Sequence, residues 1–169
     1  MNTQPLFRPS TKGSTLQQAL KIMNVPLTNI GFDEDVKINT NQDGYYILNI
    51  GNEQDTGGTH WTGCVVKNNQ VLYFDSFGVP APETFEKQIP LTKNLTSLNY
   101  WYNPYQIQMI GQGRCGLYVV LFIVFMYYSQ LPPLEAFKEF IKSWDYNDLK
   151  NNTQLAIKFW NNLKNFTHQ

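Results

Sequence analysis

The most apolar part of the chain is residues 117–128, where every side chain is aliphatic, aromatic or Met. A helix that crosses a bilayer needs about 20 such residues, so this shorter stretch predicts a helix buried inside a globular protein. Two prolines at 132–133 end the pattern, because proline cannot continue a helix interior. Helical spacing of apolar residues then predicts two amphipathic helices, at 133–144 and 152–165, packed on the rest of the chain.

Before residue 111 the chain alternates between short apolar runs and polar links. Runs rich in β-branched and aromatic residues predict strands, which we expect at 45–50, 60–66, 71–75, 98–102 and 105–110. Helical spacing after Ser14 or Thr15, either of which could cap a helix, predicts a helix through Met23, and a short helix is expected near 82–87. The other segments are expected to be irregular: the arm 1–13, the loop-rich 24–44 and the polar loop 51–59.

The strands at 60–66 and 71–75 are expected to form a hairpin whose turn is the asparagine pair at 68–69. With that turn, strand alternation places His60 and Asp75 on one face as diagonal neighbours. A carboxylate in that position can accept a hydrogen bond from one imidazole nitrogen and leave the other nitrogen free to act as a base. The alternative is a His–Asp hydrogen bond that is purely structural and has no catalytic role.

Cys115 is the candidate nucleophile because it follows a glycine-punctuated loop and opens the apolar helix. A helix N-terminus presents unpaired N–H groups and a positive dipole end, which favour a thiolate and can receive an oxyanion. The alternative is a buried cysteine that caps a core helix. Cys64 lies about 13 Å along the strand from His60 at ~3.3 Å per residue, so we interpret it as a core residue.

An oxyanion hole usually contains a second hydrogen-bond donor besides a backbone N–H group. Glutamine side chains upstream of Cys115 could supply it, and physical reasoning alone does not choose among them. The candidates are Gln106, Gln108 and Gln112.

Composition narrows the function further. The 169 residues suit one domain over 1–169, and 13 basic residues balance 13 acidic ones. No basic stripe of the kind that nucleic-acid binding requires is visible, and no metal site is expected because the two His and two Cys lack zinc spacing. We see no signal peptide, so we expect a reducing compartment and no structural disulfide.

Three segments, "GGTHW", "YFDSFG" and "GQGRCGLY", carry a resemblance to a known family. The order His60-Trp61, Asp75, a glutamine, then Cys115 at a helix start resembles the adenain-like cysteine proteases. That family contains the adenovirus proteinase and its relatives in virophages and Maverick/Polinton elements. The pattern is more distantly similar to proteases that mature ubiquitin-like modifiers. The segments span residues 57–118, about a third of the chain.

The resemblance implies a role for each residue of this set. His60 is the base, Asp75 orients it and Cys115 attacks the substrate. In the family a glutamine six or seven positions before the Cys completes the oxyanion hole, which selects Gln108. The family also implies an α+β, papain-like fold in which the catalytic Cys begins a buried helix against a mixed central sheet. The same segments suggest residues that line the substrate cleft: Trp61, Gly58, Thr59 and Gly113.

The implied reaction is endoproteolysis after small residues, chiefly glycine, in viral capsid or structural precursor proteins during virion maturation. We expect a monomer in the virion and host-cell cytoplasm, without a membrane or nucleic-acid partner. The adenovirus enzyme is basic and uses DNA and a viral peptide as cofactors. This chain is neutral, so no cofactor is expected.

Three other functions remain open at this point. The first is a deconjugating or processing protease for a ubiquitin-like protein, with the same site. The second is a non-catalytic binding or structural virion module. The third is an acyltransferase with the same order of residues, which would require a coenzyme A site that the sequence does not indicate.

Overall fold

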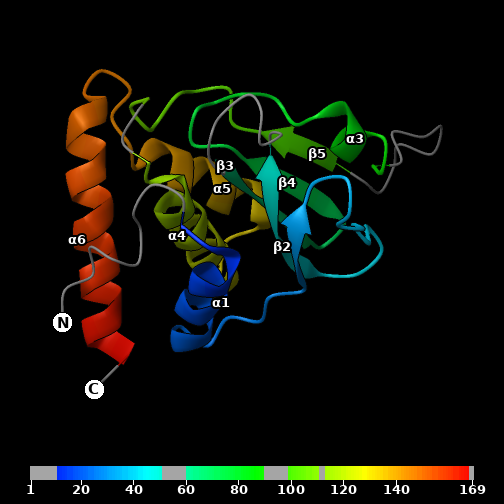
Figure 1. Cartoon of the computed structure of the whole chain (residues 1–169), viewed down its shortest axis with the longest axis horizontal. Coiled ribbons are helices and arrows are strands. Elements are labelled where there is room, and N and C mark those ends of the chain that lie inside the picture. The colour runs from blue at the N-terminus through cyan, green and yellow to red at the C-terminus, as the bar shows by residue number, and fades with distance from the viewer. Residues whose placement is uncertain (1–10, 51–59, 90–98, 111–112, 168–169) are drawn as a thin grey trace.

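A computed structural model of the chain describes residues 11–50, 60–89, 99–110 and 113–167. Five strands form one sheet in the order β1-β2-β3-β4-β5 (Figure 1). The outer pairs, β1 with β2 and β4 with β5, are parallel, and the inner pairs are antiparallel. The sheet is therefore mixed, as expected. The strands are β1 Asn29–Phe32, β2 Gly44–Ile50, β3 His60–Lys67, β4 Gln70–Phe74 and β5 Asn99–Tyr102.

Helix α4 lies at the centre of the helical part of the molecule. It packs against β3 and contacts the three other long helices, and Figure 1 shows it between α6 and the sheet. The predicted α+β fold is thus confirmed. The helices are α1 Gly13–Ile22, α3 Glu83–Glu86, α4 Cys115–Tyr128, α5 Pro133–Lys142 and α6 Leu149–Thr167.

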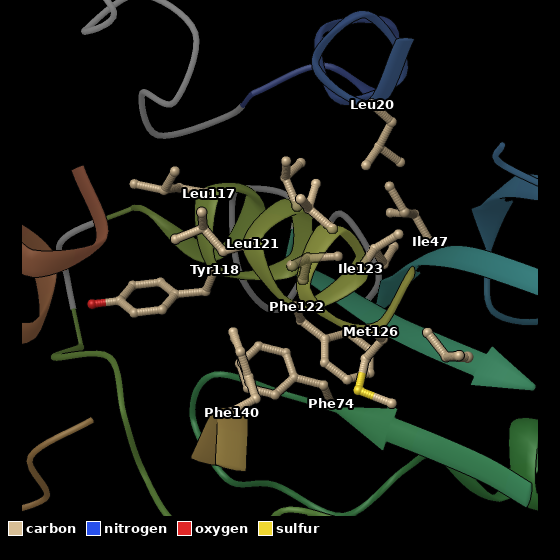
Figure 2. Packing of buried hydrophobic residues seen from close by; sticks show 14 of the residues in the cluster. Leu20, Ile47, Phe74, Leu117, Tyr118, Leu121, Phe122, Ile123, Met126 and Phe140 are labelled. Atoms are coloured by element: carbon tan, nitrogen blue, oxygen red, sulfur yellow. The ribbon is translucent and has the colours of Figure 1, made fainter. Parts of the chain in front are cut away.

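The apolar character of α4 on all sides explains its position. All but three of its residues are buried, and Phe122 stacks on Phe74 with ring centroids 5.0 Å apart and meets Phe140 edge-on at 5.7 Å (Figure 2). A helix without a polar face must be covered by other elements. None of the helices within the described residues has the length and apolar character that a bilayer crossing requires.

Gly63 allows α4 to approach β3 closely. A Cβ atom at this position would lie 3.0 Å from the Phe122 ring and 3.2 Å from a methyl group of Val119. Both neighbours are fully buried, so they have little room to move away.

Gly63→Ala is therefore expected to lower the free energy of unfolding by about 1–3 kcal/mol, the usual cost of overpacking a core. Gly31→Ala is the matched control, because its Cβ would meet only a Val36 methyl group, at 3.3 Å, beside an edge strand. Urea denaturation of both variants measures the difference. Equal decreases of the free energy of unfolding in the two variants would contradict a tight contact between α4 and β3 at Gly63.

The opposite face of the sheet has a second, smaller core. Its members include Cys64 and Tyr73, and α3 covers them through Phe85, whose ring centroid lies 5.0 Å from that of Tyr73. Trp61, Phe74 and Cys115 belong to the larger core on the α4 side. The two cysteines therefore lie on opposite faces of the sheet.

The hairpin has the predicted register, because Val66 pairs with Val71 and Cys64 with Tyr73. Asn68 and its neighbour Asn69 have φ values of 51° and 63°, as the tight turns of β-hairpins require. The predicted helices at 14–23, 82–87, 117–128, 133–144 and 152–165 are all present, with ends that shift by a few residues.

Three local predictions were wrong. Residues 105–110 form no strand, because the N–H groups of Ile107 and Gln108 both donate to the Ser76 carbonyl instead of a sheet ladder. Residues 29–32 were predicted as loop but form β1, whose edge position leaves little apolar burial to detect. Helix α1 begins at Gly13 and has no side-chain cap. The predicted polar loop 51–59 and residues 1–10 of the predicted arm lie outside the described residues.

Candidate active site

His60 and Asp75 meet at one end of the central hairpin. His60 is the first residue of β3 and Asp75 follows the last residue of β4. The His60 Nε2 and Asp75 Oδ1 atoms are 2.9 Å apart, and the two side chains are 16% and 4% exposed. The predicted pairing of these residues is therefore confirmed.

Asp75 is held from several directions. Its Oδ1 atom also accepts a hydrogen bond from the Phe77 N–H at 2.7 Å. The buried Asn103 side chain accepts from the Asp75 N–H at 3.0 Å and donates to the Asp75 carbonyl at 2.8 Å. These bonds restrict the carboxylate to one position, where it can orient the imidazole.

Phe77 stacks on the His60 ring, with centroids 4.7 Å apart and an interplanar angle of 21°. This contact covers one face of the imidazole and favours its protonated form, since an aromatic face attracts a cation. Phe77 was not among the predicted site residues. The available signal was its position two residues after Asp75, which allows its N–H and its ring to serve the same His–Asp pair.

Cys115 is the first residue of α4, and its side chain reaches the start of β3. The Trp61 N–H donates to the Cys115 Sγ at 3.4 Å. The Cys115 side chain also acts on the His60 imidazole and raises its pKa. Because the Asp75 carboxylate binds Nε2, Nδ1 is the ring nitrogen left for the sulfur. The structure thus brings His60, Asp75 and Cys115 together.

The surroundings of His60 alter its pKa. Burial alone lowers the pKa, but hydrogen bonds and negative charge from Asp75 and Cys115 outweigh it and raise the pKa of His60 to about 9. The imidazole is therefore protonated at neutral pH.

This pKa predicts a titration that can be observed directly. The His60 ring protons are expected to titrate with a midpoint near pH 9 by NMR. Asp75→Asn removes the carboxylate charge, so the midpoint should move to lower pH. The chain has only two histidines, so a His60→Gln spectrum assigns the signals. A wild-type midpoint near pH 6.5 would contradict the arrangement.

The same shift has a consequence for stability. Because the folded-state pKa of His60 lies above its ordinary value of about 6.5, His60 stabilises the fold fully below pH 6.5. That contribution is lost as pH rises through about 9. The free energy of unfolding of the wild type should therefore fall over this range more steeply than that of Asp75→Asn, as measured by urea denaturation.

Gln108 is fully buried and its amide is anchored at one end only. The Ser76 hydroxyl donates to Gln108 Oε1 at 2.6 Å. The Nε2 atom has no hydrogen-bond partner among the described residues. A buried N–H group without a partner is costly, so an unused donor at this place calls for an explanation. By contrast, the Gln106 amide donates to the Gln108 carbonyl at 3.0 Å.

The remaining predicted site residues have different surroundings. Gly113 lies two residues before Cys115 and has a φ of 62°, which glycine tolerates best. The Trp61 ring is buried in the larger core and its Nε1–H donates to the Thr11 carbonyl at 2.9 Å. Their roles in substrate binding stay predictions. The other candidates, Gly58, Thr59 and Gln112, lie outside the described residues.

Cys64 lies in different surroundings from Cys115. It is completely buried on the far face of the sheet, and burial raises the pKa of its thiol. Neither Cys64 nor Cys115 forms a disulfide. Across the described ranges, no group of three His, Cys, Asp or Glu side chains could hold a metal ion. The groups that the structure brings together here are the Cys115 thiol, the His60 imidazole and the Asp75 carboxylate.

No family model matches the chain, and a search of curated protein sequences finds no match.

Proposed function

We propose that this protein is a cysteine endopeptidase of the adenain-like type, with Cys115 as nucleophile. The observation that supports this most is the meeting of three groups at the start of β3. His60 is hydrogen-bonded to Asp75, and the neighbouring Trp61 N–H donates to the Cys115 sulfur. A sulfur at a helix start, a protonated imidazole and an orienting carboxylate are the parts of an activated thiol nucleophile.

The reaction begins when the Cys115 thiolate attacks a peptide carbonyl carbon. A C–S bond forms and the carbonyl π pair moves onto oxygen. The tetrahedral intermediate then collapses, the C–N bond breaks, and the His60 imidazolium gives its proton to the leaving amine. The acyl group remains on sulfur as a thioester. Asp75 holds the imidazole throughout.

Hydrolysis of the thioester completes the cycle. The neutral His60 takes a proton from water as the water oxygen attacks the thioester carbon. The C–S bond breaks, the thiolate leaves, and the imidazolium–thiolate pair is restored. In both halves the Cys115 backbone N–H and the Gln108 Nε2–H bind the negatively charged oxygen. The unpartnered, buried Nε2 of Gln108 supports this role.

The proposed substrate class rests on the resemblance alone: viral structural precursors cleaved after small residues, chiefly glycine. The test is co-expression of the full chain with a candidate capsid precursor, followed by mass spectrometry of the new termini. Termini that follow glycine support the proposal. Cleavage only of a ubiquitin-like protein ending in Gly-Gly would instead favour a deconjugating protease.

A labelling experiment separates an enzyme from an inert fold without knowledge of the substrate. Iodoacetamide reacts with thiolates, so at pH 6 an ion-paired Cys115 should react much faster than a free thiol. The buried Cys64 should stay unlabelled, which peptide mapping would verify. If Cys115 reacts with iodoacetamide no faster than a free thiol does, the enzymatic proposal is contradicted.

A further inference from the structure

The dipeptide Asp75-Ser76 connects the two halves of the site. Asp75 binds His60 through its side chain. The next residue, Ser76, is fully buried and binds Gln108 twice, through its hydroxyl at 2.6 Å and through its carbonyl, which accepts from the Gln108 N–H at 2.9 Å.

A glutamine side-chain amide can rotate so that its oxygen and nitrogen exchange positions, because the two groups have almost the same shape. The two orientations differ in chemistry. With Nε2 free, the amide donates to an oxyanion. With Oε1 free, the amide presents a partial negative charge and repels one. A working oxyanion donor therefore needs a partner that holds its oxygen.

A hydroxyl can donate to an amide oxygen or accept from an amide nitrogen. In this structure the Ser76 hydroxyl donates to Gln108 Oε1, which makes Ser76 that partner. We infer that the Ser76 hydroxyl is the positioning group of the oxyanion hole, holding Gln108 Oε1 so that Nε2 is the free end. This inference rests on the proposed function. The Ser76 hydroxyl supplies the hydrogen bond to the oxygen, and the buried Nε2 is left without a partner.

The backbone around Gln108 is held as well. The Ile107 N–H donates to the Ser76 carbonyl at 2.8 Å. From α6, the buried Asn152 side chain donates to the Ile107 carbonyl at 2.9 Å. The main chain is therefore held at Ile107 and at the Gln108 N–H, and the Ser76 hydroxyl holds the side-chain amide.

The test uses a peptide aldehyde, acetyl-Gly-glycinal, and requires no natural substrate. The Cys115 sulfur adds to the aldehyde carbon, the π pair moves onto oxygen, and no group leaves. The resulting hemithioacetal places its oxygen in the oxyanion hole and protects Cys115 from iodoacetamide. The concentration that gives half-protection reports how well the hole binds that oxygen.

Ser76→Ala is expected to raise the half-protection concentration on the order of 10-fold, less than the ~100-fold expected when Gln108→Met removes the donor itself. The alkylation rate without aldehyde should stay close to the wild-type rate, because alkylation depends on the thiolate alone. Adding Ser76→Ala to Gln108→Met should cause no further loss, since Ser76 acts through Gln108.

Two further variants keep the result interpretable. Thr62→Val removes another fully buried hydroxyl from the sheet and should leave half-protection unchanged. Ser76→Cys keeps the size of the side chain with a weaker donor, and serves if Ser76→Ala does not fold. Its half-protection should lie between those of the wild type and Gln108→Met.

The outcomes separate this inference from the proposed function. Two results would overturn the role of Ser76 while the protease proposal stands. One is a half-protection concentration that Ser76→Ala leaves unchanged. The other is a rise caused by Ser76→Ala that is equally large in the wild type and in Gln108→Met. If the aldehyde fails to protect wild-type Cys115, or Cys115 is not unusually reactive, the proposed function and the inference fall together.

Discussion

Replacing Cys115 with Ala is expected to abolish peptide cleavage. Removal of a catalytic nucleophile lowers kcat on the order of 10⁶-fold, because the residues that remain contribute only binding and oxyanion stabilisation. His60→Ala should cause a loss of similar size, since the thiolate–imidazolium pair acts as a unit. The measurement is cleavage of a precursor that the wild-type chain cuts, followed by mass spectrometry of the products.

Cys64→Ala is the matched control for this experiment. The Cys64 side chain is identical to that of Cys115 and is fully buried. It belongs, however, to the core on the other face of the sheet. Alanine is preferred to serine here, because serine would bury a hydroxyl without a partner. The variant should keep its activity. Cleavage that survives Cys115→Ala but is lost in Cys64→Ala would show that the nucleophile is Cys64 and not Cys115.

Replacing Gln108 with Met is the second large expected effect. It removes the amide donor but keeps an unbranched side chain of similar length. Loss of one oxyanion-hole donor typically lowers kcat by about 10²–10³-fold, or roughly 3–4 kcal/mol of barrier. KM should change little, because the oxyanion exists only in the transition state and the tetrahedral intermediate.

Gln106→Met tests the choice between neighbouring glutamines. The Gln106 amide is engaged with the Gln108 carbonyl, so its loss should have a much smaller effect on kcat. Thermal melts of both variants would establish that each is folded. A greater loss of kcat in Gln106→Met than in Gln108→Met would show that the oxyanion donor has been misassigned.

Local sequence signals predicted the hairpin well. An asparagine pair that accepts positive φ and two flanking apolar runs define the register without information from the rest of the chain. That register alone brings His60 and Asp75 to the same end of the hairpin. The start of α4 was predictable for a similar reason, since a glycine-punctuated loop ends where an uninterrupted apolar run begins.

Other parts of the site depend on contacts that no local pattern encodes. Residues 105–110 have the composition of a strand. However, the N–H groups of Ile107 and Gln108 bind the carbonyl of Ser76, a residue far earlier in the chain. Likewise, Phe77 resembles any core aromatic in sequence. Only the fold places its ring on the imidazole of His60.

The sequence by itself determined the short-range half of the site: a histidine and an aspartate paired by a tight hairpin, and a cysteine at the start of an apolar helix. Only the tertiary structure decided that these parts meet, because the contact between β3 and α4 depends on core packing around Gly63 and not on local hydrogen bonds. It also showed a difference between two glutamines: among the described residues the Gln108 amide nitrogen has no partner, whereas that of Gln106 donates to the Gln108 carbonyl.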